Sequence, residues 1–123
     1  MNNEVLKALR ESRSVRSFKP EQIKDEELKA VLEAGIYAPT GMGHQDPWIV
    51  AVQNPEIVAQ LVRMNAKIMG TDSNPYYGAP TIVLVFASHP EKWFTSVHDG
   101  TLVLGNMMNA AYAVGLGSCW IHR

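Results

Sequence analysis

The sequence predicts a single domain of the α/β or α+β class, and three observations support this prediction. Segments with helical patterns and segments with strand patterns alternate along the chain. Its 123 residues are close to the length of one domain, and 46% of them are apolar, which suffices for a packed core. No internal repeat, linker or low-complexity tract divides the chain, so we expect residues 1–123 to fold as one unit.

Four segments are expected to be helical, because apolar residues recur along them at helical spacing or capping residues bound them. In chain order they are residues 3–11, a helix capped at its start by Asp25, a helix that begins at Asn54-Pro55 and ends at Gly70, and the long segment Asp99–Val114. The residues expected on the inner faces of the first three are Val5, Ala8, Leu9, Leu28, Val31, Leu32, Ile36, Ile57, Leu61 and Ile68. The fourth segment is apolar nearly all round, which is typical of a buried helix.

Three apolar segments bounded by turn-forming residues are the expected strands. Trp48–Val52 and Thr81–Ala87 are apolar runs of strand length, and Ser118–Ile121 begins a third strand. Ser12–Lys24 lacks periodicity and should be an extended loop, whereas Thr71–Pro80 is rich in turn-forming residues. The expected order is therefore helix, helix, strand, helix, strand, helix, strand.

Charge and composition argue against several classes of function. The net charge is −1 and the isoelectric point is about 6.4, so no large basic surface is available for a nucleic acid or an anionic membrane. Gly100–Ile121 carries no charge and is long enough to span a bilayer, but its glycines and polar residues favour a buried helix followed by a strand. The single cysteine, Cys119, forms no internal disulfide, and the N-terminus is charged where a signal peptide is apolar, so we expect a cytoplasmic protein.

Two arginines flank a hydroxyl in the segment Arg13-Ser14-Val15-Arg16, where the first helix gives way to the extended loop. Guanidinium groups bind phosphate with planar, multidentate geometry, so Arg13, Ser14 and Arg16 could form an anion site. Two solvated arginines after a helix would give the same pattern, and the spacing alone does not separate these interpretations.

Two glycine-containing segments could also approach a ligand. Ala38–Gln45 leads into a strand, its small residues would let a flat ligand lie close to the backbone, and Gln45 could pair with a polar ring edge. Gly115–Arg123 lies where a helix ends and a strand starts, a common place for ligands in α/β folds. Each segment could equally be an ordinary connection between two elements.

The remaining candidates for chemistry are weaker. The four histidines are scattered, and none has a second metal ligand at the usual spacing. The neighbours His98 and Asp99 would point about 100° apart on a helix, so capping and solvation explain them better than a catalytic pair does. Cys119 lies in an apolar segment and is expected to be a small core residue.

In this order, the three segments resemble the flavin-dependent nitroreductase family. Ser12–Phe18 resembles the arginine- and serine-containing segment with which family members hold FMN. Ala38–Gly41 resembles the family's Ala-Pro-Ser/Thr-Gly loop, Ala79-Pro80 its Ala-Pro before the second strand, and Gly115–Ser118 the end of its central helix. Met64–Pro80 is similar to the small single-domain members found in anaerobic bacteria, so the resemblance extends over the whole chain.

The resemblance implies an FMN-binding fold with a central mixed sheet flanked by helices in three layers. It places these residues at the cofactor: Arg13, Ser14 and Arg16 at the phosphate, the ribityl chain and the N1/O2 edge, Pro39, Thr40 and Gly41 reaching in from the other subunit with Gln45 nearby, and Trp120, Ile121 and His122 along the isoalloxazine ring. A further family asparagine corresponds to Asp72 or Asn74. No side chain is implied as a catalytic acid or base, because the flavin carries the chemistry.

The implied activity is the transfer of electron pairs from NAD(P)H to nitroaromatic, quinone or flavin acceptors by a ping-pong mechanism in a homodimer. Two departures from the family pattern stand beside it. Ser12 replaces the first arginine of the phosphate segment, and family members continue well past the position of Arg123, so we expect a C-terminally truncated member. The alternative function is a flavin-binding or non-catalytic interaction protein on the same fold.

Overall fold

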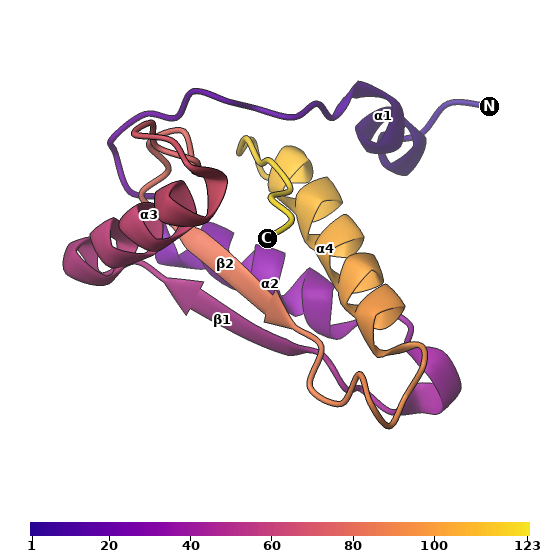
Figure 1. Cartoon of the computed structure of the whole chain (residues 1–123). Helices are drawn as coiled ribbons and strands as arrows, with labels where there is room; N and C mark the ends of the chain where they lie inside the picture. The colour runs from indigo at the N-terminus through magenta and orange to yellow at the C-terminus, as the bar shows by residue number, and fades with distance from the viewer.

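The computed structural model describes residues 1–123 and consists mainly of helices, with a small sheet between them (Figure 1). The elements in chain order are α1 (Glu4–Glu11), α2 (Asp25–Ile36), the 3₁₀ turn η1 (Gly41–Gly43), β1 (Trp48–Val52), α3 (Pro55–Met69), β2 (Ile82–Phe86) and α4 (Ser96–Ala113). Every predicted helix and the first two predicted strands are present, and α4 begins three residues before its predicted start. The predicted class is confirmed.

The sheet consists of β1 and β2, which run antiparallel and are connected through α3. The register pairs Trp48 with Phe86 at one end and Val52 with Ile82 at the other. The third predicted strand, Ser118–Ile121, is wrong, because this segment leaves the end of α4 and meets the N-terminal loop instead of β1 or β2. It makes there a single parallel bridge between Ser14 and Ser118.

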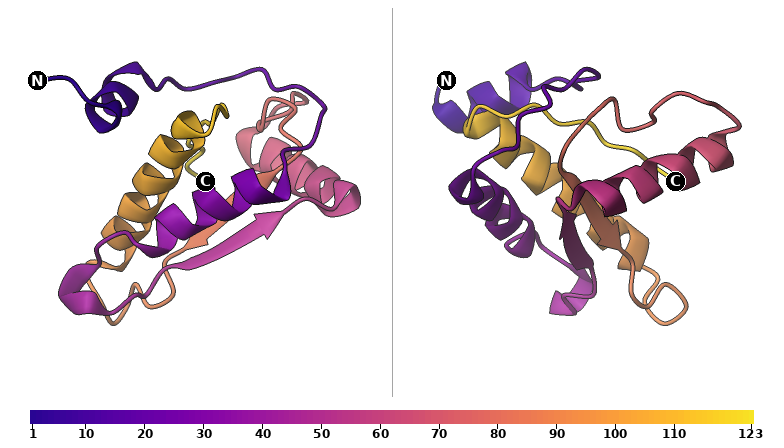
Figure 2. Two further views of the ribbon diagram at one scale, coloured as in Figure 1. Left: turned by 180° about the vertical axis from the view of Figure 1, so that it is seen from behind. Right: turned by 90° about the vertical axis from the view of Figure 1, so that its left-hand side faces the viewer.

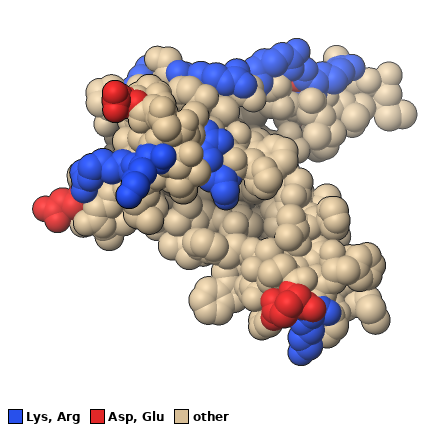
Figure 3. All heavy atoms as spheres, in the orientation of Figure 1, with Lys and Arg blue, Asp and Glu red and all other residues tan.

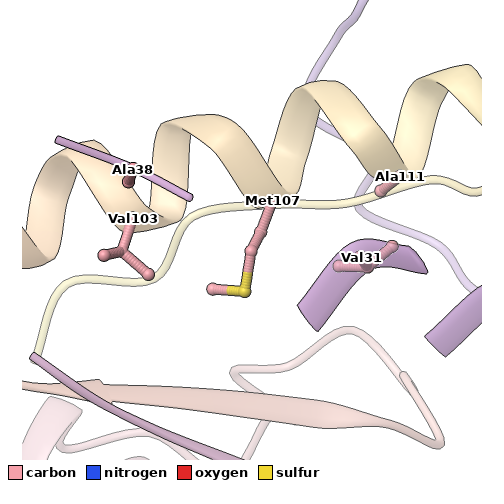
Figure 4. Packing of buried hydrophobic residues seen from close by; sticks show 5 residues of the cluster. All are labelled: Val31, Ala38, Val103, Met107 and Ala111. Atoms are coloured by element: carbon pink, nitrogen blue, oxygen red, sulfur yellow. The ribbon is translucent and has the colours of Figure 1, made fainter. Parts of the chain in front are cut away.

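The core lies between α2, α4 and one face of the strand pair. Val31, Ala38, Val103, Met107 and Ala111 are its buried members, and Figure 4 shows Met107 reaching from α4 toward the other elements. The views in Figure 2 show α2 and α4 running side by side. Side chains from one face of the strand pair complete the packing: Ile49, Val83 and Val85.

Close approach of α2 and α4 depends on Gly35 in α2. A Cβ added at this position would lie 2.9 Å from Met107 Cγ and 3.1 Å from Ile49 Cδ1, both tighter than ordinary contacts. Met107 fills this space and is only 4% exposed. The pair therefore sets the spacing of the two helices.

The start and end of α2 differ from the prediction. Asp25 is the first helical residue, and Lys24 occupies the N-cap, where its backbone N–H donates to Glu27 Oε2 at 2.8 Å. The acidic first turn suits the positive end of the helix dipole, so Asp25 stabilises the helix from inside it. Ile36, expected on the inner face, is the last helical residue and is exposed.

The inner faces predicted for α1 and α3 are wrong in this chain. Val5 and Leu9 on α1 and Ile57 and Ile68 on α3 are all exposed, the last by 71%. Only Ala8 and Leu61 of the two predicted faces are half-buried. Local periodicity shows that a helix has an apolar stripe but not which neighbour covers it. The caps of α3 are confirmed: Asn54 accepts from the amides of Glu56 and Ile57, and Gly70 ends the helix with φ +66°.

The long apolar helix α4 is buried on one side only, whereas its composition predicted a helix buried all round. Asp99 and Ser96 are buried near its start, while Val97 and Leu102 lie on an exposed side. None of the helices combines the length and the hydropathy that a bilayer span requires.

Replacing Met107 with alanine is expected to destabilise the fold by about 2–5 kcal/mol, because it leaves a cavity between α2 and α4. The measurement is the free energy of unfolding from urea titration monitored by circular dichroism. Met64→Ala, on the exposed side of α3, is the matched control and should change this free energy by less than about 0.5 kcal/mol. Equal losses in the two variants would contradict the position of the core.

Candidate functional site

The first and third candidate segments lie against each other. The backbone N–H of Val15 donates to the carbonyl of Ser118 at 2.9 Å, beside the bridge between Ser14 and Ser118. Gly117 permits this approach, since a Cβ at its position would lie 2.8 Å from Val15 Cγ2. Residues far apart in the sequence thus form one site at the C-terminal end of α4 (Figure 1).

The arginines of this site keep much of their hydrogen-bonding capacity. Arg13 Nη1 donates to the backbone carbonyls of Arg10 at 2.6 Å and Ser12 at 2.8 Å, which orients its side chain along the end of α1. Arg16 is exposed and pairs with no carboxylate. Lys and Arg side chains gather along the upper edge of the molecule in Figure 3, where Figure 1 draws the N-terminal segment. An anion could therefore be bound here without breaking an existing ion pair.

The C-terminal segment crosses from the end of α4 toward the end of α3. Trp120 and His122 are exposed, and their rings are tilted by 49° with centroids 5.9 Å apart. Ile121 between them is half-buried. Arg123 Nη2 lies 2.7 Å from Met69 Sδ at the end of α3. The segment thus presents aromatic surface beside the Arg13–Arg16 segment.

A buried asparagine with an unpaired oxygen lies on α3, the helix whose end Arg123 of the C-terminal segment contacts. Asn65 Nδ2 donates to the Leu61 carbonyl at 3.1 Å and to the Tyr76 hydroxyl at 2.6 Å, but its Oδ1 is buried without a partner. Burial raises the pKa of Tyr76, and the nearby Arg123 guanidinium opposes that shift. Asn65 belongs to the Met64–Pro80 segment that resembles the family, but no local pattern indicates a role for it. A buried acceptor without a donor is a place where a ligand N–H could bind.

Asp72 and Asn74, the two residues predicted to correspond to the family asparagine at the flavin, have different surroundings from Asn65. Asn74 Oδ1 accepts from the backbone N–H of Tyr76 at 2.9 Å, so its carbonyl is already used by the turn. Asp72 is exposed in the same connection. Neither has the unsatisfied buried acceptor that Asn65 has.

The second candidate segment lies at the opposite end of α4. Pro39, Thr40, Gly41 and Gln45 precede β1, and the backbone N–H of Gly41 donates to Asp99 Oδ1 at 2.9 Å. Since α4 has 18 residues and rises roughly 27 Å, these residues lie far from Arg16 in the same chain. One chain therefore brings together two of the three predicted groups, and the third stands apart.

The small residues of this second segment serve the chain's own packing. A Cβ at Gly41 would lie 2.9 Å from Thr95 Cβ and closer still to its hydroxyl, so the loop packs directly on the start of α4. The expectation that Asp99 is solvated is wrong: it is 3% exposed and accepts from both Gly41 and Thr95. Its partner at Gly41 is too distant in sequence for a local pattern to indicate it.

Asp46, which the sequence analysis did not single out, is the centre of a second buried cluster. Its carboxylate accepts from the backbone amides of Ser88 at 3.2 Å and His89 at 3.1 Å, from the Ser96 hydroxyl, and from His89 Nδ1 at 2.5 Å. Burial alone would raise the pKa of Asp46, but the hydrogen bonds from Ser96 and His89 outweigh it and lower the pKa from 3.8 to about 2. The cluster connects the start of β1 to the loop between β2 and α4.

No three side chains of His, Cys, Asp or Glu lie together in an arrangement that could hold a metal ion. Cys119, expected in a strand, lies instead in the irregular C-terminal segment and is half-buried.

Replacing Asp46 with asparagine is expected to destabilise the protein at neutral pH and to change its response to acid. Because folding lowers the pKa of the Asp46 carboxyl, the carboxylate stabilises the folded state fully at pH values above the pKa in the unfolded chain, about 3.9. That contribution is lost as the pH falls through about 2. The difference in unfolding free energy between parent and Asp46→Asn should therefore narrow from pH 4 to pH 2. Asp72→Asn, an exposed control, should track the parent throughout, and a constant difference for Asp46→Asn would refute the assignment.

Solved structures similar to this one include proteins with a bound flavin. A nitroreductase of Bacteroides fragilis with bound FMN superposes with a TM-score of 0.89 and 34% identity, over 98% of this chain and 70% of that one. A nitroreductase of Desulfitobacterium hafniense, also with bound FMN, gives a TM-score of 0.82 and 30% identity, over 94% of this chain and 68% of that one.

Sequence comparison agrees with this structural likeness. A protein of Archaeoglobus fulgidus, which carries the provisional name NADH dehydrogenase/NAD(P)H nitroreductase, is 28% identical in an alignment of 123 positions that covers 96% of this chain and 67% of the relative. The sequence model of the nitroreductase family matches residues 9–75. These matches show that the chain belongs to the nitroreductase family of oxidoreductases.

Proposed function

We propose that the protein is an FMN-dependent oxidoreductase that passes electron pairs from NAD(P)H to nitroaromatic, quinone or flavin acceptors by a ping-pong mechanism. The observation that carries the proposal is the contact between the Arg13–Arg16 segment and Gly117–Ser118, which joins an anion site to exposed aromatic surface. A flavin mononucleotide has the same two parts, a phosphate and a flat ring. The family and the FMN bound in its solved relatives support the choice of cofactor.

The residues present fit this cofactor. Arg16, with no acidic partner, would bind the phosphate together with Arg13 and the Ser14 hydroxyl. Trp120, Ile121 and His122 would lie along the ring, and the unpaired Oδ1 of Asn65 is an acceptor for a ring N–H. When bound, the flavin would supply the redox chemistry by accepting and returning an electron pair. The chain's part is to bind, orient and shield it.

We also propose a homodimer, because a single chain leaves the predicted site in two pieces. Pro39, Thr40, Gly41 and Gln45 lie at the other end of α4 from Arg16, and a second copy could bring them to the partner's flavin. The side of α4 with the exposed Leu102 and the half-buried Gly105 is the expected contact, since a Cβ at Gly105 would meet nothing within 4 Å. The single half-buried thiol suits a cytoplasmic location.

The proposed function is tested directly by spectroscopy. Titration with FMN should give a yellow protein in which the flavin fluorescence changes on binding, and NADH or NADPH should then bleach the flavin absorption in the absence of air. Adding a quinone should restore the absorption, as a ping-pong mechanism requires. A protein that binds FMN but is not reduced would instead be the non-catalytic flavin-binding alternative.

The phosphate assignment predicts that Arg16→Ala weakens FMN binding by about tenfold or more, since a hydrogen bond to a charged group is worth roughly 1.5–3 kcal/mol. Fluorescence titration measures the dissociation constant. Arg63→Ala, an exposed arginine on α3, removes the same charge elsewhere and should leave the constant nearly unchanged. A parental affinity in Arg16→Ala would disprove the assignment.

The dimer contact predicts that Gly105→Trp leaves the single chain folded but drives the protein to monomers, because the indole would fill the space between the two copies. Sedimentation velocity measures the oligomeric state, and far-UV circular dichroism checks the helix content. Ala59→Trp, at an exposed position of α3, is the control and should remain dimeric. If Gly105→Trp sediments as a dimer, α4 is not at the interface.

A further inference from the structure

The loop that carries Thr40 and Gln45 has an unusual backbone. Met42 and Gln45 both adopt left-handed conformations, with φ +51° and +50°, and Gly43 between them has φ +68°. Residues with a side chain rarely adopt this region unless the surrounding structure imposes it. Within the loop, the backbone N–H of Gln45 donates to Thr40 Oγ1 at 3.0 Å and that of Gly43 to the Thr40 carbonyl at 3.1 Å. Two further restraints come from outside the loop.

The first restraint is Asp99 at the start of α4. Its Oδ1 accepts from the backbone N–H of Gly41, and its Oδ2 accepts from the Thr95 hydroxyl at 3.1 Å. Asp99 is buried, and both carboxylate oxygens have donors from its own chain. It thus fixes the start of the left-handed stretch without an oxygen left for a ligand.

The second restraint is Asp46, immediately after the left-handed stretch. Its four donors come from Ser88, His89 and Ser96, so it fixes the end of the loop to the connection between β2 and α4. The ring of His44 stacks on Trp93 of the same connection, with centroids 3.7 Å apart. Carboxylates on both sides therefore hold residues 42–45.

We infer that Asp46 and Asp99 are positioning residues, which hold Thr40–Gln45 in the shape with which this loop meets the flavin of the partner subunit. The inference rests on the proposed function. Preorganisation explains why strain is maintained here: a loop that is already shaped loses little entropy on meeting a rigid ring. Both carboxylates act through the loop and touch no ligand themselves.

The test compares FMN binding and loop order in matched variants of the full chain. Asp99→Ala should raise the FMN dissociation constant by about tenfold or more, at a temperature where the protein stays folded and dimeric. Asp99→Asn should rescue binding to within about threefold, because its carbonyl still accepts from Gly41 and its amide can donate to Thr95. The control is Glu91→Gln, which removes one negative charge, as Asp99→Ala does, from an exposed residue of the neighbouring loop. Exchange of the backbone amide hydrogens of residues 40–45 without FMN should accelerate only in Asp99→Ala.

The two measurements separate this inference from the proposed function. If the parent binds FMN and Asp99→Ala binds it equally well, or if exchange of the loop does not accelerate, the positioning role is overturned. If the parent binds no FMN, the proposed function fails, while hydrogen exchange still shows whether Asp99 fixes the loop. Should Asp99→Ala not fold, Ser96→Ala removes one hydrogen bond from Asp46 and should raise the dissociation constant by about two- to fivefold.

Discussion

The packing of α4 against α2 is the constraint on which the rest of the structure depends. Met107 occupies the space that Gly35 leaves open, and the surrounding core residues close round it. Because a helix is stiff, fixing its middle also fixes its two ends. The start of α4 carries Asp99 to the backbone of Gly41, and its end delivers the segment of Gly117 to the N-terminal loop.

The two ends of α4 differ in the sign and the burial of the charged side chains near them. At the start of α4 the carboxylates of Asp46 and Asp99 are buried and surrounded by donors of the same chain, as buried charges must be. At the other end Arg16 is exposed and pairs with no carboxylate, so its guanidinium is free for the anion of the proposed site. One helix thus separates a region of buried, hydrogen-bonded carboxylates from a region with an exposed and unpaired guanidinium.

The local elements could be predicted from the sequence because their signals are local. Asn54-Pro55 and Gly70 mark the ends of α3, and the apolar runs at Trp48–Val52 and near Ile82–Phe86 are strands. The third strand could not be predicted correctly, since an apolar segment extends a sheet only if a partner edge lies beside it. The inner faces of α1 and α3 were wrong for a related reason: an apolar stripe does not identify its neighbour.

The sequence by itself determined the class of the fold, the order of its helices and of strands β1 and β2, and the residues that make an anion site chemically reasonable. Only the tertiary structure decided which of those residues meet. It joined Ser14 to Ser118, kept Gly41 at the far end of α4, and revealed Asp46, Asp99 and Asn65 as buried polar groups. The hydrogen bond between Gly41 and Asp99 spans 58 residues, and contacts at that separation leave no periodic trace in a single sequence. They exist because the packing of α2 on α4 brings the two segments together.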